Sequence, residues 1–252
     1  MLMKIGIIGA MHEEVELIID QIQQKKISEF GNRIFYEGQF FGIDCVVAFS
    51  RWGKVAAATT ATTLLLEFNV DRVVFIGIAG AVVPELNVGD IVVGERLFQH
   101  DMDARPFLHR YEIPLTGITS IPTNKTEITW AADAVHNFLK NEKEFRKELL
   151  EHNITNPKLQ IGDIASGDLF VAGAERKATI NRNLPSVLCV EMEGAAVAQV
   201  CFDFGTPMVI IRTICDTADE SSAEKFPYFK EHLAAKYGFY ILKAMAEQLL
   251  NN

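Results

Sequence analysis

The chain has 252 residues, of which 49% are apolar and 23% are charged, and its formal net charge is −9. This is enough apolar sequence for a sizeable core, and we expect one domain over residues 1–252. An acidic chain without clustered lysine or arginine lacks the electrostatic footprint of a nucleic-acid-binding protein. It also lacks the basic patch that holds a protein to an anionic membrane surface.

The N-terminal apolar run stops at Glu13 and Glu14, where a signal peptide would need a small-residue cleavage site. No stretch reaches the roughly 18 apolar residues of a membrane span. The four cysteines lie in apolar runs and form no C-x-x-C pair, so we expect reduced core thiols and no zinc site. These features predict a cytoplasmic protein.

Apolar runs alternate with helical patterns along the chain. We expect strands at residues 4–10, 36–40 and 43–49 (a hairpin), 72–82, 89–99, 159–166, 187–190 and 207–216. We expect helices at residues 11–22, 54–68, 124–156 (charged and on the surface), 174–183 and 192–204, and a last one that ends near Leu250. Buried strands that alternate with helices indicate an α/β fold with a mostly parallel sheet covered on both faces.

Polar or glycine-rich segments follow four of the apolar runs. They are Glu13 and Glu14, the turn at residues 77–80, Glu191 and Glu193, and Asp216. In open α/β sheets, ligands bind beyond the carboxyl ends of the strands. A single acid at such a position is more often a helix cap, but acids after three strands together favour a binding site.

Other motifs are weak. The segments GIIG and GIAG do not match G-x-G-x-x-G, and no G-K-[ST] follows them. No G-x-S-x-G elbow is present, and the histidines form no metal-binding pattern. Carboxylates without metal ligands or a nucleophile suit the cleavage of a glycosidic bond, which needs an acid, a base and groups that hold the sugar hydroxyls.

Four motifs occur in order: GIIGAMHEEV at 6–15, SGDLF at 166–170, VEMEGAAVAQV at 190–200 and RTICDTAD at 212–219. With them, the chain resembles the 5′-methylthioadenosine/S-adenosylhomocysteine nucleosidases of the nucleoside phosphorylase superfamily over nearly its whole length. The resemblance implies a three-layer α/β/α fold around a central mixed, mostly parallel sheet. It also implies a homodimer, no cofactor, and hydrolysis of an adenine N-ribosidic bond in methionine salvage.

The resemblance assigns roles by position. Asp216 is expected to be the general acid that protonates adenine N7, Glu14 to hold and activate the attacking water, and Glu193 to bind the ribose 2′- and 3′-hydroxyls. The other residues expected at the substrate are Met11, Trp52, Ile78, Phe107, Phe170 (stacked on adenine), Val171 (whose backbone reads the adenine edge), Glu191, Met192 and Phe226. For Glu191, substrate contact and support of its neighbours are equally open.

The resemblance also implies that a partner subunit contributes to the pocket around the 5′-substituent. Phe107 and Pro114 are expected to cap the pocket of the partner, and Phe226 to close the pocket of its own chain.

Several positions depart from the family pattern. The family loop S-G-I-G-K is here Ser50-Arg51-Trp52-Gly53-Lys54, with Trp52 near the expected 5′-substituent. Ile78 and Cys215 each replace a serine. Arg105 is also outside the pattern, and with Arg51 it could indicate an anionic 5′-group, although a surface arginine is the simpler interpretation.

These departures leave other functions open. The protein could be a related adenine nucleosidase that acts on AMP or aminodeoxyfutalosine, or a non-catalytic nucleoside-binding protein. A phosphate-dependent phosphorylase is disfavoured, because Phe75 and Ile78 stand where superfamily phosphorylases have an arginine and a serine for the phosphate.

Overall fold

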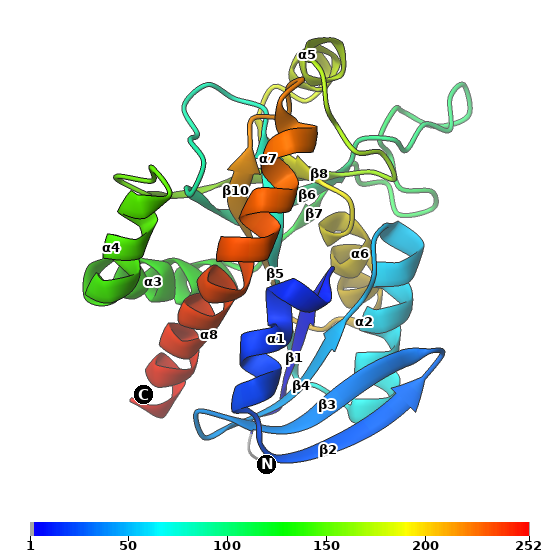
Figure 1. Ribbon diagram of the computed structural model, residues 1–252. Coiled ribbons are helices and arrows are strands. Elements are labelled where there is room, and N and C mark those ends of the chain that lie inside the picture. Colours follow the sequence, from blue (N-terminus) through cyan, green and yellow to red (C-terminus); the bar gives the residue numbers. More distant parts are fainter. Residues whose placement is uncertain (1–2, 252) are drawn as a thin grey trace.

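The computed structural model describes residues 3–251 (Figure 1). Its strands are β1 (Ile5–Gly9), β2 (Gln23–Phe30), β3 (Arg33–Phe40), β4 (Ile43–Phe49), β5 (Arg72–Ala81), β6 (Ile91–Gln99), β7 (Ile121–Pro122), β8 (Leu159–Ser166), β9 (Val187–Glu191) and β10 (Met208–Asp216). Its helices are α1 (His12–Gln21), α2 (Lys54–Phe68), α3 (Lys125–Asn141), α4 (Lys143–Glu151), α5 (Ala174–Asn183), α6 (Gly194–Phe204), α7 (Ser222–Phe229), the π-helical turn η1 (Lys230–Ala234) and α8 (Ala235–Leu250).

The strands form one mixed sheet in the order β10-β6-β8-β9-β5-β1-β4-β3-β2, and β7 pairs with β6. Parallel pairs occupy its centre, where β1 lies between β4 and β5 and where β5 also pairs with β10. Because β5 pairs with both β9 and β10, the strands β5, β10, β6, β8 and β9 form a closed circuit.

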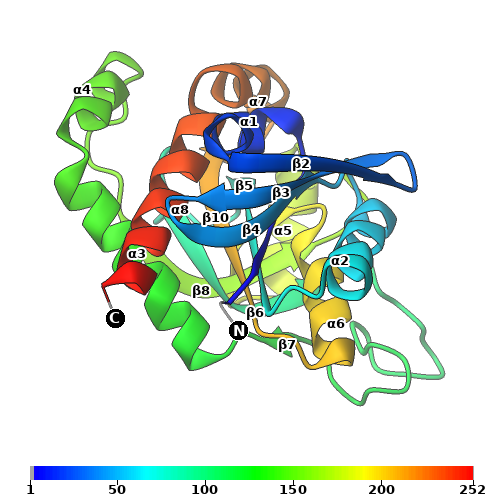
Figure 2. The ribbon, with the colours of Figure 1, turned by 90° about the horizontal axis from the view of Figure 1, so that it is seen from below.

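Helices cover both faces of the sheet, which confirms the predicted α/β fold with three layers. Helices α1, α3 and α8 pack together on one face, and α2 and α6 pack against each other on the other face. Figure 2 shows the two groups on opposite sides of the central strands. No helix in residues 3–251 is long and apolar enough to cross a bilayer.

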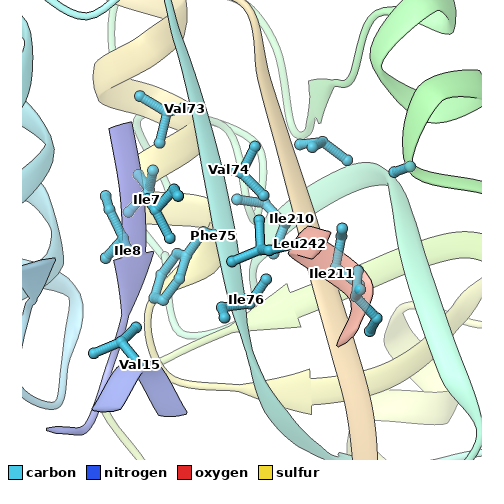
Figure 3. Close-up of a cluster of buried hydrophobic side chains, with 14 of the residues drawn as sticks. Ile7, Ile8, Val15, Val73, Val74, Phe75, Ile76, Ile210, Ile211 and Leu242 are labelled. Carbon is cyan, nitrogen blue, oxygen red and sulfur yellow. The ribbon is translucent and has the colours of Figure 1, made fainter. Parts of the chain in front are cut away.

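The core lies between the central strands and their helices. Strands β1 and β10 are buried along their whole lengths. Figure 3 shows apolar side chains of β1, β5 and β10 meeting Val15 of α1 and Leu242 of α8. All four cysteines are buried and none forms a disulfide. This packing fixes the ends of β1, β5 and β10, from which the site is built.

Strand β9 approaches these ends from the opposite direction. It runs antiparallel to β5, with Gly80 paired with Val190, and parallel to β8, with Ser166 paired with Glu191. Sequence reasoning placed Glu191 and Glu193 at the same edge as the other acids. The structure brings them to the same place because β9 enters the circuit from the other side of the site.

Most predicted elements are confirmed, and the differences are local. Strand β2 was not predicted, because its almost fully exposed, charged sequence has no apolar alternation. The single helix expected at 124–156 is instead two helices, α3 and α4, separated at Glu142. The helix after β9 begins at Gly194 instead of Met192. The expected last helix is divided into α7, η1 and α8, with Pro227 inside α7.

Candidate active site

A cavity of about 330 Å³ lies where β1, β5, β9 and β10 end. Apart from four carboxylates, its walls are mainly apolar, and no lysine, arginine or histidine of residues 3–251 lines it. The lining residues are Ala10, Met11, Glu14, Trp52, Ile78, Ala79, Gly80, Leu169, Phe170, Val171, Val190, Glu191, Met192, Glu193, Cys215, Asp216, Ala223 and Phe226. The structure therefore brings together every predicted site residue except Phe107.

Glu14 lies in the first turn of α1 and is buried. Its Oε2 accepts hydrogen bonds from the backbone N–H groups of Ala10 (2.6 Å) and Met11 (2.9 Å), and its Oε1 accepts one from Ile78 (3.1 Å). Burial raises the pKa of the Glu14 carboxyl, and the charge of Arg212 and these N–H donors oppose the rise. A Cβ at Gly77 would lie 2.9 Å from Glu14 Oε1, so only glycine allows β5 to approach this closely.

Asp216 ends β10, and its two stronger hydrogen bonds are both made to one carboxylate oxygen. Its Oδ1 accepts hydrogen bonds from the Ala218 backbone N–H (2.8 Å) and the Ser222 hydroxyl (2.6 Å). Its Oδ2 has the Cys215 thiol at 3.0 Å. The buried Ser222 hydroxyl also accepts a hydrogen bond from the Asp219 N–H at 2.9 Å, which directs the hydroxyl hydrogen to Asp216. Sequence reasoning missed Ser222, because a serine at a helix start is normally a cap.

Glu191 is the centre of a buried ion pair with Arg212. Its Oε2 accepts hydrogen bonds from Arg212 Nη2 (2.6 Å) and Nε (3.1 Å) and from the Gly194 N–H (2.7 Å). Its Oε1 accepts one from the Ser166 hydroxyl. The guanidinium of Arg212 lies over the Phe75 ring, 4.1 Å from its centroid. Most of the hydrogen-bond acceptor capacity of Glu191 is therefore used within the protein.

Arg212 was considered in the sequence only as a neighbour of Asp216. In the structure it bonds to Glu191 and to backbone carbonyls of Phe75 and Ile211. An arginine inside a buried apolar strand requires an acidic partner, and this signal could have indicated the pair with Glu191.

Glu193 lies before α6 with its carboxylate at the cavity. Its Oε1 accepts a hydrogen bond from the Gly53 N–H (2.7 Å), and its Oε2 has only a longer contact with the Met192 N–H (3.3 Å). Burial and the adjacent charge of Glu191 raise the pKa of Glu193 to about 8. Gly53, at a φ of 92°, turns its N–H toward this carboxylate from the start of α2.

Three aromatic rings lie at the outer side of the cavity. Phe226 contacts Trp52 and Phe170 edge to face, with ring centroids 6.0 Å and 5.7 Å apart. Trp52 is 58% exposed and Phe170 is 42% exposed, whereas Val171 beside them is buried. Phe170 and Trp52 therefore have ring surface available for a bound molecule.

Three other residues singled out in the sequence lie away from the cavity. Phe107 is 89% exposed, and neither it nor Pro114 lines the cavity of its own chain. Both lie in the long connection between β6 and β7. Arg105 forms an ion pair with Asp103, two residues away, and does not reach the cavity.

A mainly apolar cavity with convergent carboxylates at strand ends is the ligand site of an α/β protein that binds a small molecule. The chain belongs to the phosphorylase superfamily, whose family model matches residues 4–247. This finding agrees with the resemblance seen in the four motifs.

Solved structures support the same relationship. The chain is 32% identical to a 5′-methylthioadenosine/S-adenosylhomocysteine nucleosidase from Neisseria meningitidis in complex with methylthio-immucillin-A (TM-score 0.86; 98% of this chain and 100% of that chain covered). It is 34% identical to the corresponding nucleosidase from Colwellia psychrerythraea in complex with adenine (TM-score 0.85; 99% and 96% covered). It is 35% identical to a futalosine hydrolase from Helicobacter pylori (TM-score 0.82; 98% of both chains covered).

Proposed function

We propose that the protein hydrolyses the N-ribosidic bond of 5′-methylthioadenosine and S-adenosylhomocysteine, releasing adenine and a 5-thioribose product. The observation that carries this proposal is the meeting of Glu14, Glu193 and Asp216 in one mainly apolar cavity. Similarity to nucleosidases of both substrates and to a futalosine hydrolase supports it.

Asp216 is the proposed general acid. Two donors already point at its Oδ1, so a proton on the carboxyl group belongs on Oδ2. With Oδ2 protonated, the Cys215 thiol donates to the Ala79 carbonyl, 3.5 Å away, instead. Transfer of the Oδ2 proton to adenine N7 makes the base a neutral leaving group, and such acid catalysis is typically worth about 10²–10⁴-fold in rate.

Glu14 is the proposed base for water. A carboxylate has about four acceptor positions, of which Oε2 uses two and Oε1 one for backbone N–H groups. The remaining position on Oε1 accepts a hydrogen bond from the attacking water. Because burial raises its pKa, Glu14 is a stronger base than an exposed glutamate.

Glu193 is the proposed partner of the ribose hydroxyls. Its Oε2 has no close donor among residues 3–251, so a sugar hydroxyl can donate to it. Met192 gives the sugar an apolar contact. Glu191 has a supporting role in this proposal, because its carboxylate is already occupied by Arg212 and Ser166.

The adenine ring is proposed to lie against Phe170, whose ring is partly exposed in the cavity. The backbone of Val171 reads the edge of the base. Met11, Ile78 and Phe226 line the sugar and 5′ side, and Trp52 extends this wall outward.

Hydrolysis is favoured over phosphorolysis by the charge of the cavity. Four carboxylates line it, and no cationic side chain of residues 3–251 does. A phosphate dianion would lose its hydration without a positive partner, which is costly. Arg212, the nearest buried cation to Glu14, is already paired with Glu191.

We further propose a cytoplasmic homodimer in which Phe107 and Pro114 cap the 5′-pocket of the partner. The exposure of Phe107 and of Leu115 on the same connection supports this arrangement, because large exposed apolar side chains suit a subunit interface. In the monomer the 5′ side of the cavity has only its own aromatic wall.

The roles of the acids are tested by measuring adenine release from methylthioadenosine with the wild type, Asp216→Asn and Glu14→Gln. Each variant is expected to lose at least ~10²-fold in turnover while still binding the substrate, which is the usual scale for a lost acid or base. Retained turnover in either variant would remove that residue from the mechanism. Binding without turnover by the wild type would support the alternative of a non-catalytic nucleoside-binding protein.

A further inference from the structure

Two loops beside the cavity come from distant parts of the chain. The loop before α2 carries Trp52 and Gly53, and the loop after β8 carries Phe170 and Val171. In the proposed function, the first loop holds Glu193 through the Gly53 N–H, and the second loop binds adenine. The position of one loop relative to the other therefore decides whether the ribose and the base are held at the same time.

The start of α2 is capped by a residue of the second loop. Gly53 is the N-cap residue of α2 and has no side chain to accept a hydrogen bond. The Lys54 backbone N–H donates instead to Asp168 Oδ1 (2.8 Å), 114 residues away in the sequence. A Cβ at Gly53 would lie 3.0 Å from the same oxygen, so glycine allows this close approach. A capping side chain usually belongs to the helix that it caps, whereas here the cap joins the two loops.

Asp101, which lies just after β6, contacts both loops. Its Oδ1 accepts a hydrogen bond from Lys54 Nζ (2.6 Å), and its Oδ2 accepts one from the Asp168 N–H (2.9 Å). Lys54 Nζ also donates to Gln99 Oε1 (3.1 Å), and Gln99 Nε2 donates to Gln199 Oε1 in α6 (2.7 Å). The network therefore joins the two loops to the end of β6 and to α6.

The geometry of this network matters more than its contribution to stability. The side chains of Lys54 and Asp101 are 16% and 22% exposed, and ion pairs that water reaches contribute little to the free energy of unfolding. Asp101 uses one carboxylate oxygen for each loop, so it fixes the distance between them. Burial raises the pKa of Asp101, but the hydrogen bonds from Lys54 and from the Asp168 backbone outweigh burial and lower it. The carboxylate is therefore charged at neutral pH.

We propose that Lys54, Asp101 and Asp168 are positioning residues of the nucleoside site, which hold the base-binding loop and the Gly53 N–H at fixed positions relative to each other. The inference rests on the proposed nucleosidase function. None of the three side chains lines the cavity, so each acts through a residue that does. Because the base and the ribose are bound both in the substrate and in the transition state, loss of a positioning residue should raise KM more than it lowers kcat.

The test compares Asp101→Ala with Glu142→Ala. Glu142 forms an ion pair of similar exposure with Lys243 of α8 (2.9 Å), away from the cavity, and is the matched control. For Asp101→Ala, we expect the KM for methylthioadenosine to rise about tenfold, the effect of one charge-assisted hydrogen bond, and kcat to change by less than about threefold. Glu142→Ala should keep both constants. A purely structural role would lower kcat through a smaller folded fraction and leave KM unchanged.

Asp168 provides a rescue by a conservative variant. Asp168→Ala removes the cap of α2 and should raise KM as Asp101→Ala does, whereas Asp168→Asn keeps a capping oxygen and should stay close to the wild type. The double variant Asp101→Ala/Asp168→Ala should raise KM by about as much as the larger single variant, because both residues belong to one network.

An unchanged KM in Asp101→Ala would overturn the proposal, as would an equal rise of KM in Asp168→Asn and Asp168→Ala. If the wild type bound methylthioadenosine without releasing adenine, the proposed hydrolysis would fail. The same comparison of variants, made with dissociation constants from calorimetry, would then decide the positioning roles. A wild type that bound neither methylthioadenosine nor adenine would overturn both proposals.

Discussion

Glu191 and Glu193 lie two residues apart and are both buried, but their carboxylates have very different hydrogen-bond partners. Glu191 is surrounded by donors: the guanidinium of Arg212, the Ser166 hydroxyl and backbone N–H groups. Glu193 has one close donor, the Gly53 N–H, and an oxygen turned to the cavity. A buried carboxylate that is paired with a cation and several other donors is part of the scaffold, whereas one with few donors can bind a ligand.

This difference explains why the chain places two acids where β9 passes into α6. The pair of Glu191 with Arg212 links β9 to β10 and holds the backbone N–H of Glu193 at 3.2 Å from Glu191 Oε2. Glu193 is thereby held at the cavity by groups that do not bind the substrate. In the proposed mechanism, Glu191 therefore orients Glu193.

The largest expected effect comes from breaking the Glu191 ion pair. Arg212→Met leaves a buried carboxylate without its cation, and removing one partner of a buried pair typically costs about 3–5 kcal/mol of the free energy of unfolding. The double variant Glu191→Gln/Arg212→Met should recover much of this loss, because no unpaired charge remains. Urea denaturation of the wild type, the two single variants and the double variant measures the coupling.

A coupling near zero between these two substitutions would contradict the scaffold role of Glu191. The Glu193→Gln variant provides the contrast, because removal of a partly unpaired buried carboxylate should leave the protein folded and stable at neutral pH.

The pH dependence of stability should report the titration of Glu193. The folded pKa of Glu193, about 8, is above the ordinary value of 4.5. The folded protein therefore binds this proton more tightly than the unfolded chain, so stability is highest below the unfolded pKa and falls as pH rises through the folded pKa. Without ligand, Glu193→Gln should become more stable relative to the wild type between about pH 4.5 and pH 8.

This prediction is checked by the free energy of unfolding of both proteins across that pH range. A constant difference between the two proteins would show that Glu193 titrates like an exposed glutamate.

Ser222 is expected to have a smaller, positional effect. Ser222→Ala removes one of the two donors to Asp216 Oδ1, and we expect turnover to fall about tenfold, roughly the net value of a hydrogen bond to a charged group. Ser221→Ala is the matched control, since the Ser221 hydroxyl donates to Asp219 and not to Asp216.

A Ser222→Ala variant with normal turnover would show that the Ala218 N–H alone is enough to orient Asp216.

The smallest effect is expected at Trp52, which acts on specificity and not on the reaction. Trp52→Ile should widen the range of accepted 5′-substituents, because the exposed indole forms part of the outer wall of the cavity and isoleucine is smaller. The kcat/KM values for methylthio, butylthio and bulkier arylthio nucleosides measure this. Identical profiles for the variant and the wild type would show that Trp52 does not contact the substituent.

The sequence predicted much of the fold, because apolar runs and helical periodicity are local signals. It also placed Glu14, Glu193 and Asp216 at one edge of the sheet, since each lies at the end of an apolar run or shortly after it. It did not predict β2, whose charged sequence forms a strand only by pairing with β3. Nor did it predict the direction of β9, which depends on how the circuit of strands closes.

The supporting contacts of the site were missed for a similar reason. Arg212 and Glu191 are 21 residues apart, and Gly53 and Glu193 are 140 residues apart. Pairs of residues so far apart in the sequence leave no periodic signal in a single sequence. Only the position of an arginine within an apolar strand could have indicated that an acidic partner exists.

The most direct test of the proposed activity is adenine release by the purified protein, with and without phosphate. The nucleosides to compare are methylthioadenosine, S-adenosylhomocysteine, 5′-deoxyadenosine, AMP and aminodeoxyfutalosine. Our account predicts release from the thio-substrates at the same rate with and without phosphate, with a free reducing sugar as the second product. Release that requires phosphate and yields a sugar 1-phosphate would contradict it, as would release from AMP or aminodeoxyfutalosine alone.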